Sequence, residues 1–220
     1  MHPFRPIHLL WTVLPLLAGC GSVVGTLVPS QTIANPANLN GARLTPSSVL
    51  KVQSVTGSAQ YDTSRSTPPA SFPDLQFPSD VPFNVRPHAA KLTASMTGAT
   101  LSGPCVAPAS FTFSLDSFRV SVWDSGNQAG QATLSGTPKL TVTATRSGTT
   151  LGGTAYTLSD HSFTISADQA TTERAITVLT SGGQNDVSAS ADVSAPDDAL
   201  AGCGLTFTLG NTSVTLSNFH

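Results

Sequence analysis

The feature that most constrains this chain is an alternation of apolar residues with hydroxyl or other polar residues, repeated in segment after segment. It is clear in residues 92–97, 111–116, 140–145, 163–168 and 187–194. Successive side chains of a strand point to opposite faces of a sheet, so each segment has one apolar face. Two such sheets bury their apolar faces against each other. The pattern predicts an all-β fold, an antiparallel β-sandwich, immunoglobulin-like or similar, with about ten strands over residues 47–220 and no helix of three turns.

Composition removes several other classes of protein. Charged residues make up 10% of the 220, the formal net charge is −2, and glutamate occurs once, at Glu173. A basic nucleic-acid binder and an acidic disordered tail are excluded, because each depends on a dense charge of one sign. A long helical bundle is disfavoured, since serine and threonine number 57 together and are poor in helix interiors.

The N-terminus has the build of a secretory signal. Arg5 supplies a positive charge, and residues 7–17 form an apolar run that contains Pro15 and is too short to span a bilayer. The run ends in Leu17-Ala18-Gly19-Cys20, an aliphatic residue and two small residues before a cysteine. This tetrapeptide resembles the lipobox of bacterial lipoproteins. A plain signal peptide with a cysteine near its cleavage site is the alternative.

The resemblance implies a lipid anchor. A diacylglyceryl group is then attached to the Cys20 thiol, the Gly19–Cys20 bond is cut, and the new amine is acylated, with palmitate as an expected fatty acid. Two or three acyl chains hold a protein stably on a membrane, whereas one does so only marginally. Residue 21 is glycine, not aspartate, which favours the outer membrane in a two-membrane bacterium. We therefore expect a signal peptide at 1–19, a lipidated flexible tether at 20–46 and a β-sandwich domain at 47–220.

The two other cysteines, Cys105 and Cys203, form an even pair once Cys20 is assigned to lipid. Disulfides persist in exported proteins, so we predict a structural disulfide between them, with two free thiols as the alternative. A metal site is a poor rival, because neither cysteine has the CxxC spacing of a zinc site.

Residues 62–88 break the alternation with six prolines and with Phe72, Phe77 and Phe83. Proline cannot donate to a strand ladder, so this Pro/Phe-rich segment cannot form a central strand. We interpret it as a strap whose rings cover the end or edge of the sandwich, or as a loop that binds a partner.

Two glycine-containing sites predict turns between strands. Gly210-Asn211 predicts a tight hairpin between residues 205–209 and 212–216, and 181–183 separates a strand at 175–180 from one at 186–193. The stretches 111–123 and 205–218, which follow Cys105 and Cys203, then look like a weak internal repeat of two hairpins. Ordinary similarity between β patterns is the alternative explanation.

Catalysis finds no support in the sequence. Asp160-His161-Ser162 does not predict a triad, because consecutive strand residues alternate between faces and cannot converge. No GxSxG, HExxH, P-loop or GxGxxG motif is present. Glu173, beside Arg174, fits one half of a surface ion pair better than a general acid.

Two weak binding signals remain. Trp123, Asp124 and Asn127 place an aromatic ring beside a polar turn, as a sugar-stacking platform does, and alternation puts Trp123 on the face opposite Phe118. A ring that closes the sheet edge is the other interpretation. The sequence predicts no cofactor. Four aspartates near one end of a hairpin offer oxygen ligands that Ca²⁺ could use, namely Asp186, Asp192, Asp197 and Asp198. An acidic turn is the simpler explanation of these residues.

These features together predict a lipid-anchored, non-enzymatic module of the bacterial cell envelope that acts in protein interaction or structure. Its partners are then the membrane, through the anchor, and an envelope protein or glycan, but no nucleic acid. The first alternative is a carbohydrate-binding module centred on Trp123, and the second is a hydrolase.

Overall fold

The computed structural model of the chain describes residues 28–44, 53–55, 58–60, 70–73, 85–159, 161–195 and 200–220. The predicted signal peptide, Cys20 and residues 21–27 and 45–46 of the predicted tether lie outside these ranges, as does most of the Pro/Phe-rich segment. The boundary predicted at residue 47 is wrong, because residues 31–34 and 43–44 form strands and Leu39 and Leu44 are buried in the core. No helix within the described ranges combines the length and apolar character needed to cross a bilayer.

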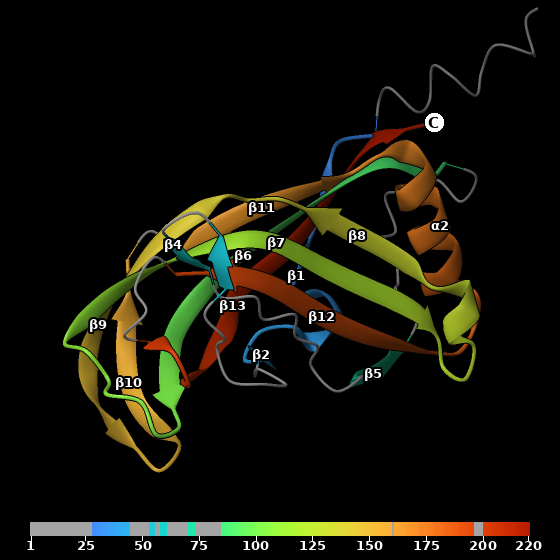
Figure 1. Ribbon diagram of the computed structural model, residues 1–220. Helices are drawn as coiled ribbons and strands as arrows, with labels where there is room; N and C mark the ends of the chain where they lie inside the picture. The colour runs from blue at the N-terminus through green and yellow to red at the C-terminus, as the bar shows by residue number, and fades with distance from the viewer. Residues whose placement is uncertain are drawn as a thin grey trace, which may run out of the picture.

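An eleven-stranded antiparallel sheet dominates the described structure (Figure 1). Its strand order is β1-β13-β6-β10-β9-β7-β12-β5, with β11 paired to β6, β2 to β13 and β8 to β7, and β3 and β4 form a separate pair. The strands are β1 (Gln31–Ala34), β2 (Arg43–Leu44), β3 (Gln53–Val55), β4 (Ser58–Gln60), β5 (Ala70–Pro73), β6 (Pro87–Ser102), β7 (Ser110–Asp124), β8 (Ala132–Gly136), β9 (Leu140–Thr150), β10 (Gly153–Leu158), β11 (Ser162–Ala167), β12 (Gln184–Ser194) and β13 (Gly204–Phe219).

Long strands let the sheet curl over itself. One end of β6 pairs with β10, where Tyr156 lies opposite Ala99, and its other half pairs with β11, where Phe163 lies opposite Ala94. In the same way, β7 pairs with β9 over residues 110–115 and with β8 over residues 118–122, and it pairs with β12 over residues 114–124. The sheet therefore faces itself in a sandwich-like arrangement (Figure 1), which confirms the predicted all-β antiparallel class. The layers belong to one continuous sheet.

The apolar residues of the alternating segments form the core, as predicted. In β12 the buried positions are every second residue, namely Asn185, Val187, Ala189, Ala191 and Val193. In the middle of the core the rings of Phe118 and Phe163 meet edge to face, with 4.7 Å between centroids. Such aromatic pairs add to the free energy gained from area burial alone.

One helix contradicts the prediction that the chain has no helix of three turns. Helix α2 (Gln169–Leu179) occupies much of the segment predicted as a strand at 175–180. Its N-terminus is capped by Asp168, whose carboxylate accepts the backbone N–H of Thr171 at 2.8 Å. Threonines have low helix propensity, and in this segment they obscure the helical periodicity of the apolar residues. In the structure Thr172 and Thr177 donate their hydroxyls to backbone carbonyls four residues earlier.

The predicted hairpin at Gly210-Asn211 is also wrong. β13 continues through these residues as one strand, and the register with β6 shifts between Gly210 and Ser213. Asn211 adopts φ 49°, a left-handed conformation that asparagine tolerates in bulges as well as in turns. The stretches 111–123 and 205–218 are therefore each part of one long strand, and neither is a hairpin. Two short 3₁₀ turns complete the fold, η1 (Pro36–Asn38) and η2 (Gln128–Gly130).

Candidate binding site

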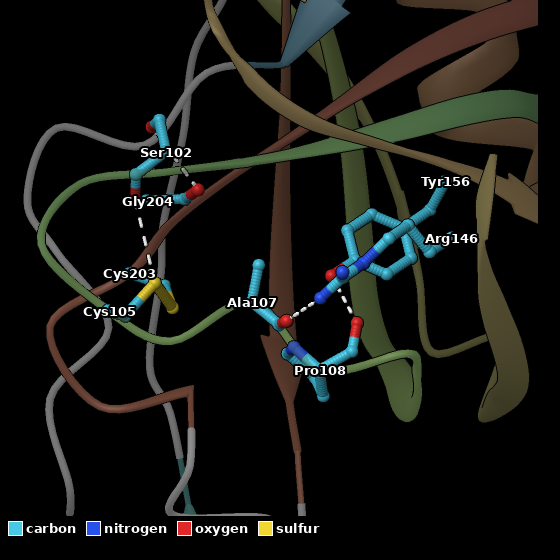
Figure 2. Close-up of a disulfide and its surroundings, with 8 residues drawn as sticks. All are labelled: Ser102, Cys105, Ala107, Pro108, Arg146, Tyr156, Cys203 and Gly204. Carbon is cyan, nitrogen blue, oxygen red and sulfur yellow. Dashed lines mark hydrogen bonds between the residues drawn. A yellow bond between two sulfur atoms is a disulfide. The ribbon is translucent and has the colours of Figure 1, made fainter. Parts of the chain in front are cut away.

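Cys105 and Cys203 form the predicted disulfide, with Cα atoms 5.3 Å apart and a separation of 98 residues in sequence (Figure 2). The bridge joins the β6–β7 loop to the residue before β13. Side chains of the neighbouring β9–β10 pair hold the same loop, because Arg146 donates to the Ala107 carbonyl and Tyr156 donates to the Pro108 carbonyl at 2.7 Å. The disulfide and these two hydrogen bonds together fix the position of the β6–β7 loop.

The proposed sugar platform is not assembled. Trp123 is only 4% exposed, which contradicts the open ring that a sugar platform needs and agrees with the other interpretation, a ring buried in the sheet. Alternation places the ring on the face opposite Phe118 but does not reveal that this face is covered as well. Asp124 accepts the hydroxyl of Ser181 at 2.5 Å, and Asn127 is exposed in the following turn. No aromatic face remains open beside these two polar residues.

The aspartates of β12 do not converge on one ion. Asp186 and Asp192 are six residues apart on a regular strand, a span of about 20 Å. Asp192 accepts the hydroxyl of Ser117 and lies 3.7 Å from the guanidinium of Arg119. Asp197 and Asp198 lie outside the described residues. Within those residues no group of three histidine, cysteine, aspartate or glutamate side chains is placed to hold a metal.

The histidine and glutamate singled out in the sequence make local contacts. The Nδ1 atom of His161 lies 3.2 Å from the Leu158 carbonyl oxygen, whereas Asp160 lies outside the described residues. Glu173 lies at the surface with its carboxylate 3.5 Å from Nε2 of His88, a contact that is an ion pair when the imidazole is protonated. Its carboxylate also accepts the side-chain amide of Gln169 at 2.8 Å.

A feature absent from the sequence predictions is an apolar cavity of about 110 Å³ between α2 and the sheet. Figure 1 shows α2 against one end of the curled sheet, next to β8. Apart from Thr172, every side chain that lines the cavity is apolar. The lining residues are Ile33, Pro36, Ala37, Leu39, Ala90, Leu92, Val120, Val122, Ala132, Leu134, Thr172, Ala175, Ile176, Leu179, Val187, Val214 and Leu216.

Helix α2 turns one face toward this cavity. Ala175, Ile176 and Leu179 lie on that face at the three- and four-residue spacing of a helix. Val120 and Val122 of β7 line it from the sheet. The spacing of Thr172, Ile176 and Leu179 in the sequence indicates a helix with one buried face. It does not predict a cavity beneath that helix.

Comparison with known proteins does not assign the chain to a family. No protein-family model matches the sequence, and no curated protein matches it. Among solved structures, the chain is weakly similar to the endo-1,3-beta-glucanase from Streptomyces sioyaensis, with 12% identity and a TM-score of 0.21 over 78% of this chain and 83% of that one. A TM-score this low supports neither a shared fold nor a shared activity.

Proposed function

We propose that this chain is a lipid-anchored, non-enzymatic binding protein of the bacterial cell envelope that holds a small apolar ligand beneath helix α2. The observation that carries the proposal is the cavity, whose lining is almost wholly apolar. Small-molecule sites are typically concave and mostly apolar, with few polar groups. The burial of Trp123 removes the support for a glycan platform. The interaction expected of residues 62–88 stays a prediction, because most of that segment lies outside the described residues.

The size of the cavity sets the size of the ligand. An apolar cavity of about 150 Å³ stays dry and binds benzene, and a water molecule occupies about 30 Å³ of liquid. The present cavity of about 110 Å³ therefore has room for about four carbon atoms, since a methylene is about as large as a water molecule. At about 0.8 kcal/mol per buried methylene, such a segment contributes about 3 kcal/mol to binding.

The binding test uses the full 220-residue chain with Cys20→Ser, which lacks the predicted acyl attachment point. We expect 1-hexanol to bind this chain in calorimetric titrations. Ala175→Leu places extra carbons in the cavity and should abolish binding, while the fold and melting temperature are kept or improved. Ala170→Leu is the matched control, because Ala170 is an exposed residue of α2 and lines no cavity. Equal binding by both leucine variants, or no binding by the parent chain, contradicts the proposal.

The envelope address is tested separately. The lipobox resemblance of residues 17–20 is its support. Intact-mass analysis of protein from its native host should show a chain that begins at Cys20 and carries fatty acyl mass. Cys20→Ser should leave the protein uncleaved or release it from membranes. A mature chain that retains residues 1–19 without acyl mass would contradict the anchor but would leave the cavity test unaffected.

A further inference from the structure

A second, polar pocket lies beside the apolar cavity. It is lined by Ala129, Gln131, Ala132, Thr133, Thr171 and Arg174, from the η2–β8 region and from α2. Ala132 lines both spaces, so the apolar cavity and the polar pocket adjoin at the start of β8. A ligand that lies over Ala132, with one end in each space, meets apolar side chains at one end and polar side chains at the other.

The polar pocket contains one cationic group that is free to bind. Arg174 is exposed and makes no ion pair with any other described residue. The acidic residues of the same helix region have other partners, because Asp168 accepts the backbone N–H of Thr171 and Glu173 contacts His88. Neither carboxylate lines the pocket. Among the described residues, Arg174 is therefore the only charged side chain that lines the pocket.

We infer that the ligand is a short-chain anionic amphiphile, a carboxylate whose alkyl chain enters the apolar cavity and whose head group binds Arg174. The inference rests on the proposed function and names the ligand class of the same site. Arginine suits a carboxylate because its planar guanidinium donates two parallel hydrogen bonds to the two oxygens. Thr171, from the preceding turn of α2, lines the same pocket.

Chain length follows from the same geometry. Because the cavity admits about four carbons, and further carbons must lead from it to the head group at Arg174, hexanoate and octanoate are the expected size class. Each added methylene should improve affinity about fourfold until the cavity is full, and longer chains should gain little.

The experiment compares octanoate with 1-octanol, which has the same chain length but no charge, on the Cys20→Ser chain. Arg174→Gln should weaken octanoate binding about three- to fivefold at low salt and leave 1-octanol binding unchanged. Arg43→Gln is the matched control, because Arg43 is exposed and lines neither space. Raising the salt from about 0.05 M to about 1 M should weaken octanoate binding by the parent chain but not by Arg174→Gln.

The outcomes separate this inference from the proposed function. If Arg174→Gln affects neither probe while Ala175→Leu abolishes both, the cavity binds an apolar ligand but the head-group assignment is wrong. Equal weakening of both probes by Arg174→Gln also overturns the assignment, because it indicates a structural effect. If Ala175→Leu changes nothing, or if neither probe binds the parent chain, the proposed function fails and the ligand class fails with it.

Discussion

Phe118 and Trp123 lie on opposite faces of β7, and both side chains are buried. Alternation in the sequence correctly separates the two faces, because neighbouring strand residues point in opposite directions. It does not reveal which face is covered by other parts of the chain. The burial of Trp123 could therefore not be predicted from the alternation of its own strand, although large aromatic rings gain much free energy from burial.

Replacement of Trp123 tests this burial. Trp123→Ala should lower the free energy of unfolding by about 3–5 kcal/mol, since the truncation leaves a large cavity in a packed region. Leu151→Ala is the control, because Leu151 is fully exposed between β9 and β10 and its loss should change stability by less than about 0.5 kcal/mol. Urea denaturation measures both values. Similar small effects at both positions would show that Trp123 is not packed.

At the scale of elements, strands were predictable where each strand alternates regularly. The stretches 111–116 and 187–194 have their apolar residues buried, as their patterns indicate. Two elements were not predictable for different reasons. The threonines of α2 resemble a strand in composition, and only their hydrogen bonds to the backbone fit them to a helix. Gly210-Asn211 suits a turn and a bulge equally well, and pairing with β6 on both sides selects the bulge.

The N-cap of α2 gives a prediction at this scale. Asp168→Ala should lower the melting temperature by about 2–4 °C at pH 7, because the Thr171 backbone N–H loses its acceptor. Asp168→Asn should remain close to the parent, since asparagine is an equally good N-cap residue. Thermal melts followed by circular dichroism measure the differences. An alanine variant as stable as the asparagine variant would show that the cap does not support the helix.

The same cap should depend on pH. The hydrogen bond from the Thr171 backbone holds the pKa of the Asp168 carboxyl below its usual range in the folded protein. Its stabilising effect is therefore complete above the unfolded-state pKa of about 3.9 and is lost as pH falls through the lower folded-state pKa. The asparagine of Asp168→Asn does not titrate, so the parent, which is close to that variant in stability at pH 7, should become less stable relative to it on acidification to about pH 2.

At the scale of the whole molecule, the binding cavity depends on contacts that no local pattern contains. Its lining runs from Ile33 to Leu216 and draws on α2, η1 and strands of both halves of the curled sheet. The sequence predicts that Leu92 and Val187 face inward, and the structure confirms it. A gap between the helix and the sheet depends instead on the summed volumes of residues brought together by the curl. For this reason the core was predictable, whereas the candidate site within it was not.

The disulfide acts at the same scale, because it connects two parts of the curled sheet that are 98 residues apart in sequence. It was predictable from cysteine parity together with the predicted exported address, without knowledge of the strand order. Cys105→Ala/Cys203→Ala should lower the free energy of unfolding by about 2–5 kcal/mol, because a long covalent loop restricts the unfolded chain. Urea denaturation measures the change, with and without reductant. The reduced parent should unfold at the same midpoint as the double variant, and the double variant should not respond to reductant. A parent midpoint that reductant leaves unchanged would show that the bridge is not a support of the fold.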